Sequence, residues 1–249
     1  MAHLLEHSAN LILARVSKET KKNFSASFKP VALDGGRVVQ EFGAPIEHIY
    51  FPLSAVLTSV QLMQEGIAAA VSMVGREGIS GLDAVLCHGP ARGHVVCQVP
   101  GAALSISTRE LRILVRQHAG LLNSILYYTS GYCAMLSQLI ACNRLHQVEP
   151  RCARWLLMIL DRIKGPVFPI TQERLGVMLG AQRPTVTTTL AALREAGCVE
   201  TSRGQVRVTN RKRLESYACE CYWLCASYFD LSTVEAPGRN LRRPAAAIS

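Results

Sequence analysis

The stretch from Gln117 to Asn143 contains no formally charged side chain. A segment of this length can cross a lipid bilayer as a helix. Its several Gln, Asn and Ser residues make it too polar for a spanning helix, however. We therefore expect a buried or dimer-forming helix and no membrane partner.

Apolar and uncharged residues recur along this stretch at alternating steps of three and four, which predicts a heptad seam. We assign the following residues of this seam to a dimer interface: Leu114, His118, Leu121, Ile125, Tyr128, Tyr132, Met135 and Leu139. A second apolar stripe lies beside it and comprises Val115, Leu122, Leu126, Cys133, Leu136 and Ile140. A helix that is apolar on two adjacent faces is expected to pack on its own domain with one face and on a second chain with the other. A single buried core helix is the alternative.

The chain before this helix has a different pattern. The first 30 residues are amphipathic and are expected to be helical. From residue 37 to about 107, short β-branched and aromatic segments alternate with Gly, Pro and Ser, and Gln64, Glu65 and Gly66 form a hairpin turn between two of them. This pattern predicts a small barrel or β-roll. Thr108 is a predicted N-cap, with Glu110 in the first helical turn.

Residues 171–197 contain two short amphipathic helices separated by a glycine. Thr171 is a predicted N-cap of the first helix, and Gly180 follows it where a left-handed residue is needed. Arg183 and Pro184 lie in the first turn of the second helix, where Pro loses no helical hydrogen bond. Two alternating segments follow, around a turn that contains Arg203. The pattern predicts a winged helix-turn-helix.

The outward side chains of the second helix suit DNA. Arg can bind guanine through two hydrogen bonds, Thr methyl groups can contact thymine, and a helix N-terminus favours phosphate. The candidate DNA-binding residues are Thr171, Gln182, Arg183, Pro184, Thr185, Thr187, Thr188 and Arg203, and residues 207 and 211–213 suit backbone phosphates. Residues 144–249 hold net charge +7 of the chain's +9, which also favours a polyanionic partner for this half.

The order of these parts, and above all the segment ITQERLGVMLGAQRPTVTTTLAALREAGCV, resembles the CRP/FNR family of bacterial transcription regulators. The resemblance implies an α+β chain with an N-terminal double-stranded β-helix (a jelly-roll-like β-roll), a long dimerisation helix and a C-terminal winged helix-turn-helix. The expected boundaries are 1–108 for a cyclic-nucleotide-binding-like sensor domain, 109–146 for the dimerisation helix, 147–232 for the DNA-binding domain and 233–249 for a flexible tail.

By the same resemblance, the protein is expected to be a cytoplasmic homodimer that binds a palindromic double-stranded operator, with RNA polymerase as a partner if it is an activator. Arg183 falls on the family's guanine-reading arginine. Pro184 and Thr188 stand where better-known members carry Glu and Arg, so the operator sequence stays open. The alternative is a ligand- or thiol-sensing module whose helix-turn-helix is not used for specific readout. We find no sequence motif of an enzyme.

The expected effector pocket departs from the family pattern within residues 75–98. Arg92 matches the arginine that holds the phosphate of a cyclic nucleotide in family members. Gly81, with Asp83 close by, stands where they carry a ribose-binding Glu, and Gly93 replaces their hydroxyl residue. We therefore expect no cyclic nucleotide and no other cofactor, and we keep Gly81, Asp83 and Arg92 as candidate pocket residues.

The nine cysteines are odd in number and scattered, which is not the pattern of a disulfide framework and favours a reducing compartment. No Cys precedes Cys87, so the N-terminal iron–sulfur ligands of the oxygen-sensing branch are missing. Cys219, Cys221 and Cys225 could supply soft ligands, but we expect them to pack a C-terminal helix, and we predict no metal site. A thiol redox response stays open.

Overall fold

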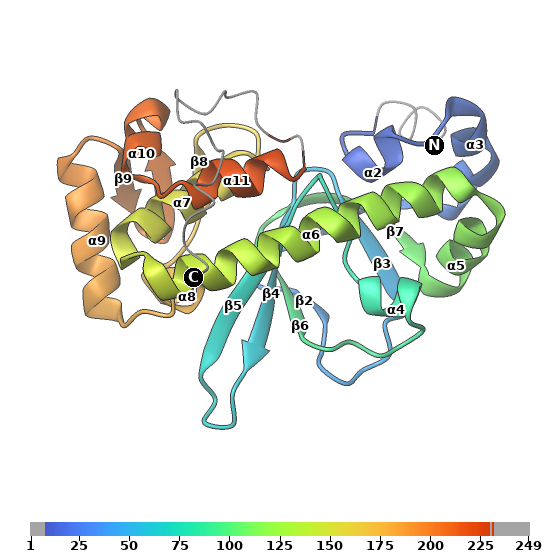
Figure 1. Cartoon of the computed structure of the whole chain (residues 1–249), viewed down its shortest axis with the longest axis horizontal. Helices are drawn as coiled ribbons and strands as arrows, with labels where there is room; N and C mark the ends of the chain where they lie inside the picture. Colours follow the sequence, from blue (N-terminus) through green and yellow to red (C-terminus); the bar gives the residue numbers. More distant parts are fainter. Residues whose placement is uncertain (1–7, 230, 232–249) are drawn as a thin grey trace, which may run out of the picture.

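The computed structural model describes residues 8–229 and 231 of the chain, so the expected tail at 233–249 and the first seven residues of the predicted sensor domain lie outside the described part. A β-sheet domain, a long helix that runs across the molecule and a mostly helical C-terminal domain follow one another (Figure 1). The predicted α+β class is confirmed. Within the described residues, no helix is both long enough and apolar enough to cross a membrane.

The N-terminal domain consists of two antiparallel sheets. One has the strand order β1-β7-β3, and the other has the order β2-β6-β4-β5. Their bounds are β1 Lys29–Leu33, β2 Val38–Gln40, β3 His48–Pro52, β4 Val56–Leu62, β5 Ala68–Val74, β6 His94–Val99 and β7 Gly101–Ser107. The predicted hairpin joins β4 to β5, and the register places Leu62 opposite Ala68. The short elements beside the sheets are α2 Leu11–Ala14, α3 Lys18–Phe24, the 3-10 helix η1 Ser25–Ser27 and α4 Leu82–Leu86.

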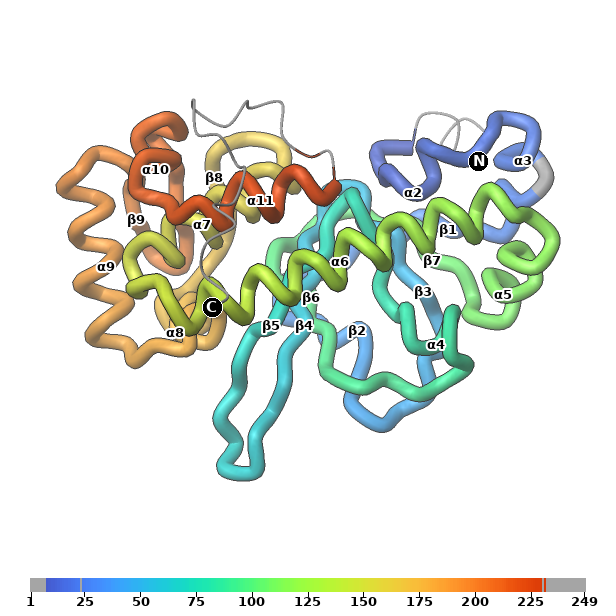
Figure 2. The backbone as a smooth tube through the Cα atoms, viewed as in Figure 1, coloured from blue at the N-terminus to red at the C-terminus, as the bar shows by residue number. Residues whose placement is uncertain are grey.

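The helix predicted over 109–146 is in fact two helices, α5 Thr108–Gln117 and α6 Ala119–Leu145. His118 has an extended backbone, with φ −128° and ψ 91°, and its ring contacts that of Phe24 at 5.8 Å between centroids. The N-cap is Ser107 rather than Thr108, because the Ser107 side chain accepts from the backbone N–H of Glu110. The break allows α5 to stay against β3 and β7 while α6 continues toward the C-terminal domain (Figure 2).

The two apolar stripes of the long helix differ in burial. The predicted dimer seam lies inside the protomer's own core: Leu121, Ile125 and Met135 are fully buried, and Tyr128 and Leu139 nearly so. Leu114 is also buried, whereas His118 and Tyr132 are half-buried. The second stripe is the accessible one, with Leu126 46% and Ile140 72% exposed.

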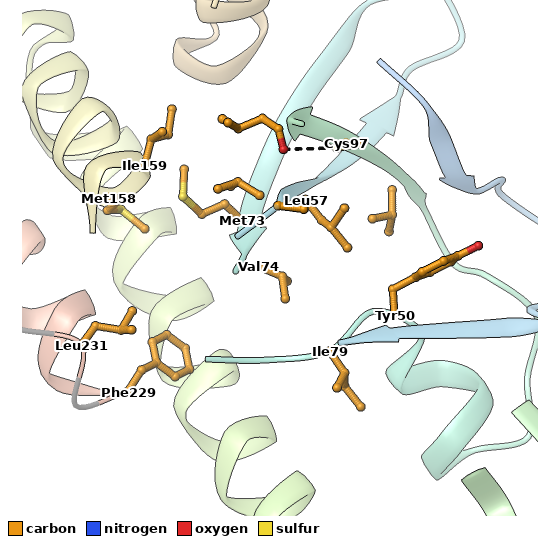
Figure 3. Packing of buried hydrophobic residues seen from close by; sticks show 14 of the residues in the cluster. Tyr50, Leu57, Met73, Val74, Ile79, Cys97, Met158, Ile159, Phe229 and Leu231 are labelled. Carbon is orange, nitrogen blue, oxygen red and sulfur yellow. Dashed lines mark hydrogen bonds between the residues drawn. The ribbon is translucent and has the colours of Figure 1, made fainter. Parts of the chain in front are cut away.

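The C-terminal domain begins with α7 Val148–Leu160 and continues with a small sheet of order β8-β10-β9 and further helices. The bounds are β8 Val167–Pro169, α8 Gln172–Leu179, α9 Arg183–Glu195, β9 Val199–Ser202, β10 Gln205–Val208, α10 Arg211–Tyr217 and α11 Cys221–Ser227. The two domains share one hydrophobic core. Figure 3 shows Met158 and Ile159 of α7 facing Met73 and Leu57 of the sheet.

A buried ion pair joins the two domains. Glu77 follows β5 in the N-terminal domain, and its Oε1 accepts from Arg162 Nε at 2.8 Å and lies 2.8 Å from Arg162 Nη2. The two side chains are only 1% and 2% exposed. Arg162 also donates to the carbonyl oxygen of Met158 at 2.7 Å. The end of α7 is therefore tied to the sheet domain by polar contacts as well as by apolar packing.

Candidate nucleic-acid interface

The predicted helix-turn-helix is present as α8 and α9. Thr171 is the N-cap of α8, and its hydroxyl accepts from the backbone N–H of Arg174 at 3.2 Å. Gly180 ends this helix with φ 58° and ψ 40°, a left-handed conformation that favours glycine. Gln182 precedes α9 as its N-cap, and Pro184 lies in the first turn as expected. Local signals in the sequence therefore predicted both ends of the turn.

The exposed and buried faces of α9 also follow the prediction. Val186 and Leu193 are fully buried and Leu190 nearly so, and this face packs against α7 and α8. The opposite face carries the candidate DNA-binding residues, all of them exposed: Gln182, Arg183, Pro184, Thr185, Thr187 and Thr188. The N-terminal half of α9 thus presents one arginine and several short polar side chains on an open surface.

Thr187 and Thr188 each have a backbone carbonyl acceptor for the hydroxyl hydrogen within α9. Thr187 donates to the carbonyl oxygen of Arg183 at 2.9 Å and also lies 3.1 Å from Gln172 Oε1. Thr188 donates to the carbonyl oxygen of Pro184 at 3.1 Å. Their methyl groups and hydroxyl lone pairs are what remains for a ligand. Such side chains suit contact with thymine methyl groups and with base donors.

The wing lies beside the start of α8. Strands β9 and β10 pair around a turn at Arg203 and Gly204, and the carbonyl oxygen of Gly204 accepts from the backbone N–H of Ile170 at 2.8 Å. This bond places Gly204, the residue after the exposed Arg203, next to Thr171. Arg207, on β10, lies 3.8 Å from Glu200 in an exposed ion pair.

One basic residue assigned to phosphates is engaged elsewhere. Arg211 bonds Asp161 Oδ1 and the Tyr222 hydroxyl through Nη2, each at 2.6 Å, and Glu215 through Nε at 2.8 Å. These contacts raise the pKa of Arg211 although its partial burial opposes the charge. Arg211 is therefore a structural residue between α7, α10 and α11, because neighbouring carboxylates already hold its donors. Lys212 and Arg213 are exposed.

A cleft of about 1090 Å³ lies in front of the helix-turn-helix. Four candidate DNA-binding residues line it: Thr171, Gln182, Arg183 and Arg203. The opposite wall is formed by residues 67–69 at the start of β5 in the N-terminal domain. The β4–β5 hairpin is therefore close to the surface that is predicted to meet DNA.

The candidate effector residues lie near one another, at the start of α4 and just before β6. Gly81 has φ +75°, and a Cβ there would come within 2.4 Å of Ile49 Cδ1 and 2.9 Å of Gln40 Nε2. Asp83 Oδ1 lies 3.6 Å from Arg92 Nε, and the Arg92 side chain is 72% exposed. The two charges expected to meet an effector are thus paired with each other.

The cysteines show an arrangement that sequence reasoning missed. Cys219 and Cys221 pack against Cys142 at the end of α6, with His146 beside them, whereas Cys225 lies in the main core. The sequence does contain a signal, because Cys142 and His146 are four residues apart, a spacing that places two ligands on one face of a predicted helix. Nothing local indicates that this pair meets Cys219 and Cys221.

Comparison with known proteins relates this architecture to one family. Residues 150–217 match the Crp-like helix-turn-helix domain. No curated protein sequence matches the chain.

Solved structures of CRP-type regulators share the fold. A CRP-family transcriptional regulator from Thermus thermophilus is 17% identical with a TM-score of 0.64, covering 76% of this chain and 96% of its own. FixK2 from Bradyrhizobium japonicum is 16% identical with a TM-score of 0.61, covering 77% and 98%. The cyclic di-GMP-responsive global regulator CLP of Xanthomonas campestris is 14% identical with a TM-score of 0.59, covering 78% and 100%. Residues 150–217 thus match a Crp-like helix-turn-helix domain, and the chain shares its fold with solved structures of CRP-type regulators.

Proposed function

We propose that the protein is a sequence-specific DNA-binding transcription regulator that acts as a homodimer on a two-fold operator. The observation that carries the proposal is the exposed N-terminal half of α9, where Arg183 lines the same cleft as the exposed wing arginine, Arg203. The proteins that share its fold are described as transcription regulators, and we propose this role rather than catalysis.

In the proposed complex, α9 enters the major groove with its N-terminus toward the bases. Arg183 is the only arginine in the first turn of α9 and would bind a guanine through its two terminal nitrogens. Thr187 and Thr188 would contact neighbouring bases through their methyl groups. Arg203 would bind a backbone phosphate beside the wing, which holds the protein in register without reading sequence.

The homodimer is proposed to form through the exposed stripe of α6, not through the seam that we first assigned. Leu126 and Ile140 lie on this stripe and are 46% and 72% exposed. Cys133 and Leu136 lie between them on the same face. A parallel pair of α6 helices would place two copies of α9 on one side of the dimer, with half-sites about 34 Å apart, which is one turn of duplex. Such a regulator would act in the cytoplasm, and RNA polymerase would be a partner if it activates transcription.

We further propose that the sensor domain does not bind a cyclic nucleotide in the way that the family does. Gln40 and Ile49 fill the space next to Gly81, where a family member would place its carboxylate side chain. The Asp83 carboxylate, 3.6 Å from Arg92 Nε, would also repel a phosphate that approached this arginine.

The experiment that tests the proposal is binding-site selection with the full-length protein, followed by affinity measurement of variants. Arg183→Ala is expected to weaken binding to the selected site by about 1–3 kcal/mol and to relax specificity at one base pair. Arg203→Ala is expected to weaken binding to all duplexes about equally. The slope of the logarithm of affinity against the logarithm of salt concentration should fall by about one.

A matched control is available in the same helix. Arg194 is exposed but lies in the last turn of α9, away from the proposed base contacts. Arg194→Ala should leave the selected motif unchanged. Binding that is independent of sequence, or a motif that survives Arg183→Ala unaltered, would contradict specific readout and favour the alternative of a sensing module.

A further inference from the structure

Four potential metal ligands meet where the DNA-binding domain joins the long helix. Cys142 is fully buried in the last turn of α6, and His146 is the residue that ends this helix. Cys219 and Cys221 are buried on either side of Glu220, where α11 begins. The three sulfur atoms and one ring nitrogen all lie within 4.8 Å of one another.

The distances fit tetrahedral coordination of one ion. The Sγ atoms of Cys142 and Cys219 are 3.6 Å apart, and Cys221 Sγ is 3.6 Å from His146 Nδ1. Zinc binds thiolate sulfur at about 2.3 Å and imidazole nitrogen at about 2.0–2.1 Å. A tetrahedron with those bond lengths separates two sulfurs by about 3.8 Å and a sulfur from a nitrogen by about 3.6 Å.

Neighbouring side chains orient the ligands as the outer partners of a metal do. His146 Nε2 lies 3.3 Å from Glu220 Oε2, so Nδ1 is the ring nitrogen left facing the sulfurs. Metal-bound histidines usually donate their second ring N–H to a carboxylate or carbonyl in this way. Gln138 donates from Nε2 to Cys221 Sγ at 3.0 Å, and such a bond favours a thiolate.

A buried cation nearby supplies the charge that such a site would need. Arg154 is fully buried in α7, and among the described residues neither its Nε nor its Nη2 has a hydrogen-bond partner. An unpaired buried charge is costly. A divalent ion bound by three thiolates and a neutral imidazole has a net charge of −1, which Arg154 would balance.

We propose that Cys142, His146, Cys219 and Cys221 form a closed structural site for one zinc ion. Soft thiolates with an imidazole are a typical zinc ligand set, and four protein ligands leave no position for a substrate. Binding would displace the thiol protons to solvent. An iron–sulfur cluster spreads its ligands over several iron atoms, whereas these four atoms surround a single point.

The position of the site indicates what the ion would do. Only His146 and Gln147 separate α6 from α7, so Cys142 and His146 lie where the chain passes from the long helix into the DNA-binding domain. Cys219 and Cys221 lie near the end of that domain, where α11 follows α10. In Figure 2, α11 lies alongside the end of α6, and the two helices are in contact. Zinc would therefore fix the position of the DNA-binding domain relative to the long helix. This role does not depend on how Arg183 reads DNA.

The first test is elemental analysis of the full-length protein, purified under reducing conditions without chelators. About one zinc ion per chain is expected. Replacement by Co²⁺ should give the visible absorption of a tetrahedral thiolate complex, which needs no variant. Removing zinc with a chelator should increase hydrogen exchange in residues 219–227.

Variants then identify the ligands. Cys142→Ser and Cys221→Ser should each lose the zinc. Cys225→Ser is the matched control, because Cys225 is buried in the same helix, outside the group of four, and its burial raises its thiol pKa to about 12. Glu220→Gln should retain zinc but bind it about 10-fold more weakly, since it only orients His146.

Three results would overturn the proposal. The first is that the reduced protein neither contains zinc nor takes up Co²⁺. The second is that zinc remains bound in both Cys142→Ser and Cys221→Ser. The third is that the purified protein contains iron in place of zinc. A Cys142–Cys219 disulfide that forms in place of metal uptake would indicate a redox pair instead. Because zinc content is measured without DNA, failure of the zinc site and failure of the proposed DNA readout can be told apart.

Discussion

The buried pair of Glu77 and Arg162 allows a quantitative test of how the two domains are held together. Glu77→Gln removes the negative charge and leaves the Arg162 guanidinium buried beside a neutral amide. Breaking one partner of a buried ion pair typically costs about 3–5 kcal/mol, because the remaining charge cannot be hydrated. Both side chains are nearly inaccessible, at 1% and 2% exposed, so we expect the full effect.

The pair itself is not expected to be a large net source of stability. Glu77 Oε2 is buried and has no hydrogen-bond partner among the described residues, so part of its desolvation is uncompensated. Replacing both residues with apolar ones of similar size, Glu77→Leu with Arg162→Met, should therefore cost far less than either single change. The backbone N–H of Gly75, which donates to Glu77 Oε1 at 3.0 Å, would lose its partner, and this limits the recovery.

Urea unfolding monitored by fluorescence and circular dichroism measures these differences. The exposed pair of Glu200 and Arg207, whose side chains are 69% and 53% exposed, is the control. Glu200→Gln should change the free energy of unfolding by about 0–1 kcal/mol. A loss of less than about 1 kcal/mol for Glu77→Gln, or a double variant as unstable as the two single losses combined, would refute the reasoning.

Two further predictions concern the dimer and the effector. Ile140→Glu puts a charge on the exposed stripe of α6 and should yield folded monomers by sedimentation that no longer bind the operator tightly. Leu121→Glu should instead unfold the N-terminal domain, because it buries a charge in the core. Folded dimers of Ile140→Glu would rule out this stripe as the interface. Titration with cyclic AMP or cyclic GMP by calorimetry should give no heat of binding, since Gln40 and Ile49 fill the space beside Gly81. Micromolar binding would show that these two side chains leave room for a nucleotide.

Short-range signals account for the features that could be predicted from the sequence. The cap at Thr171, the left-handed Gly180 and the proline in the first turn of α9 each depend on residues within a few positions. The buried face of α9 follows from helical periodicity alone. The helix-turn-helix, the wing and the outward placement of Arg183 were therefore accessible without any tertiary information.

Local signals could not show which of the two apolar stripes of the long helix packs against the sheet. Both stripes are apolar and run along the same helix, so periodicity indicates two buried faces without saying which one meets the sheet. The packing of Tyr128 illustrates what decides it. Its ring lies 5.7 Å from that of Phe229, a residue about a hundred positions later in the chain. The break between α5 and α6 at His118 could not be predicted locally either, because the residue at that position is neither Gly nor Pro.

The sequence alone determined the kinds of elements, their caps and the surface that α9 presents, because these depend on contacts between near neighbours. Only the tertiary structure decided which partners distant residues meet. It paired Arg211 with Asp161, which removes an arginine expected on DNA, and it brought Cys142 within 3.6 Å of Cys219. Such contacts depend on how whole helices pack, and a pattern within one helix does not specify the residues of another.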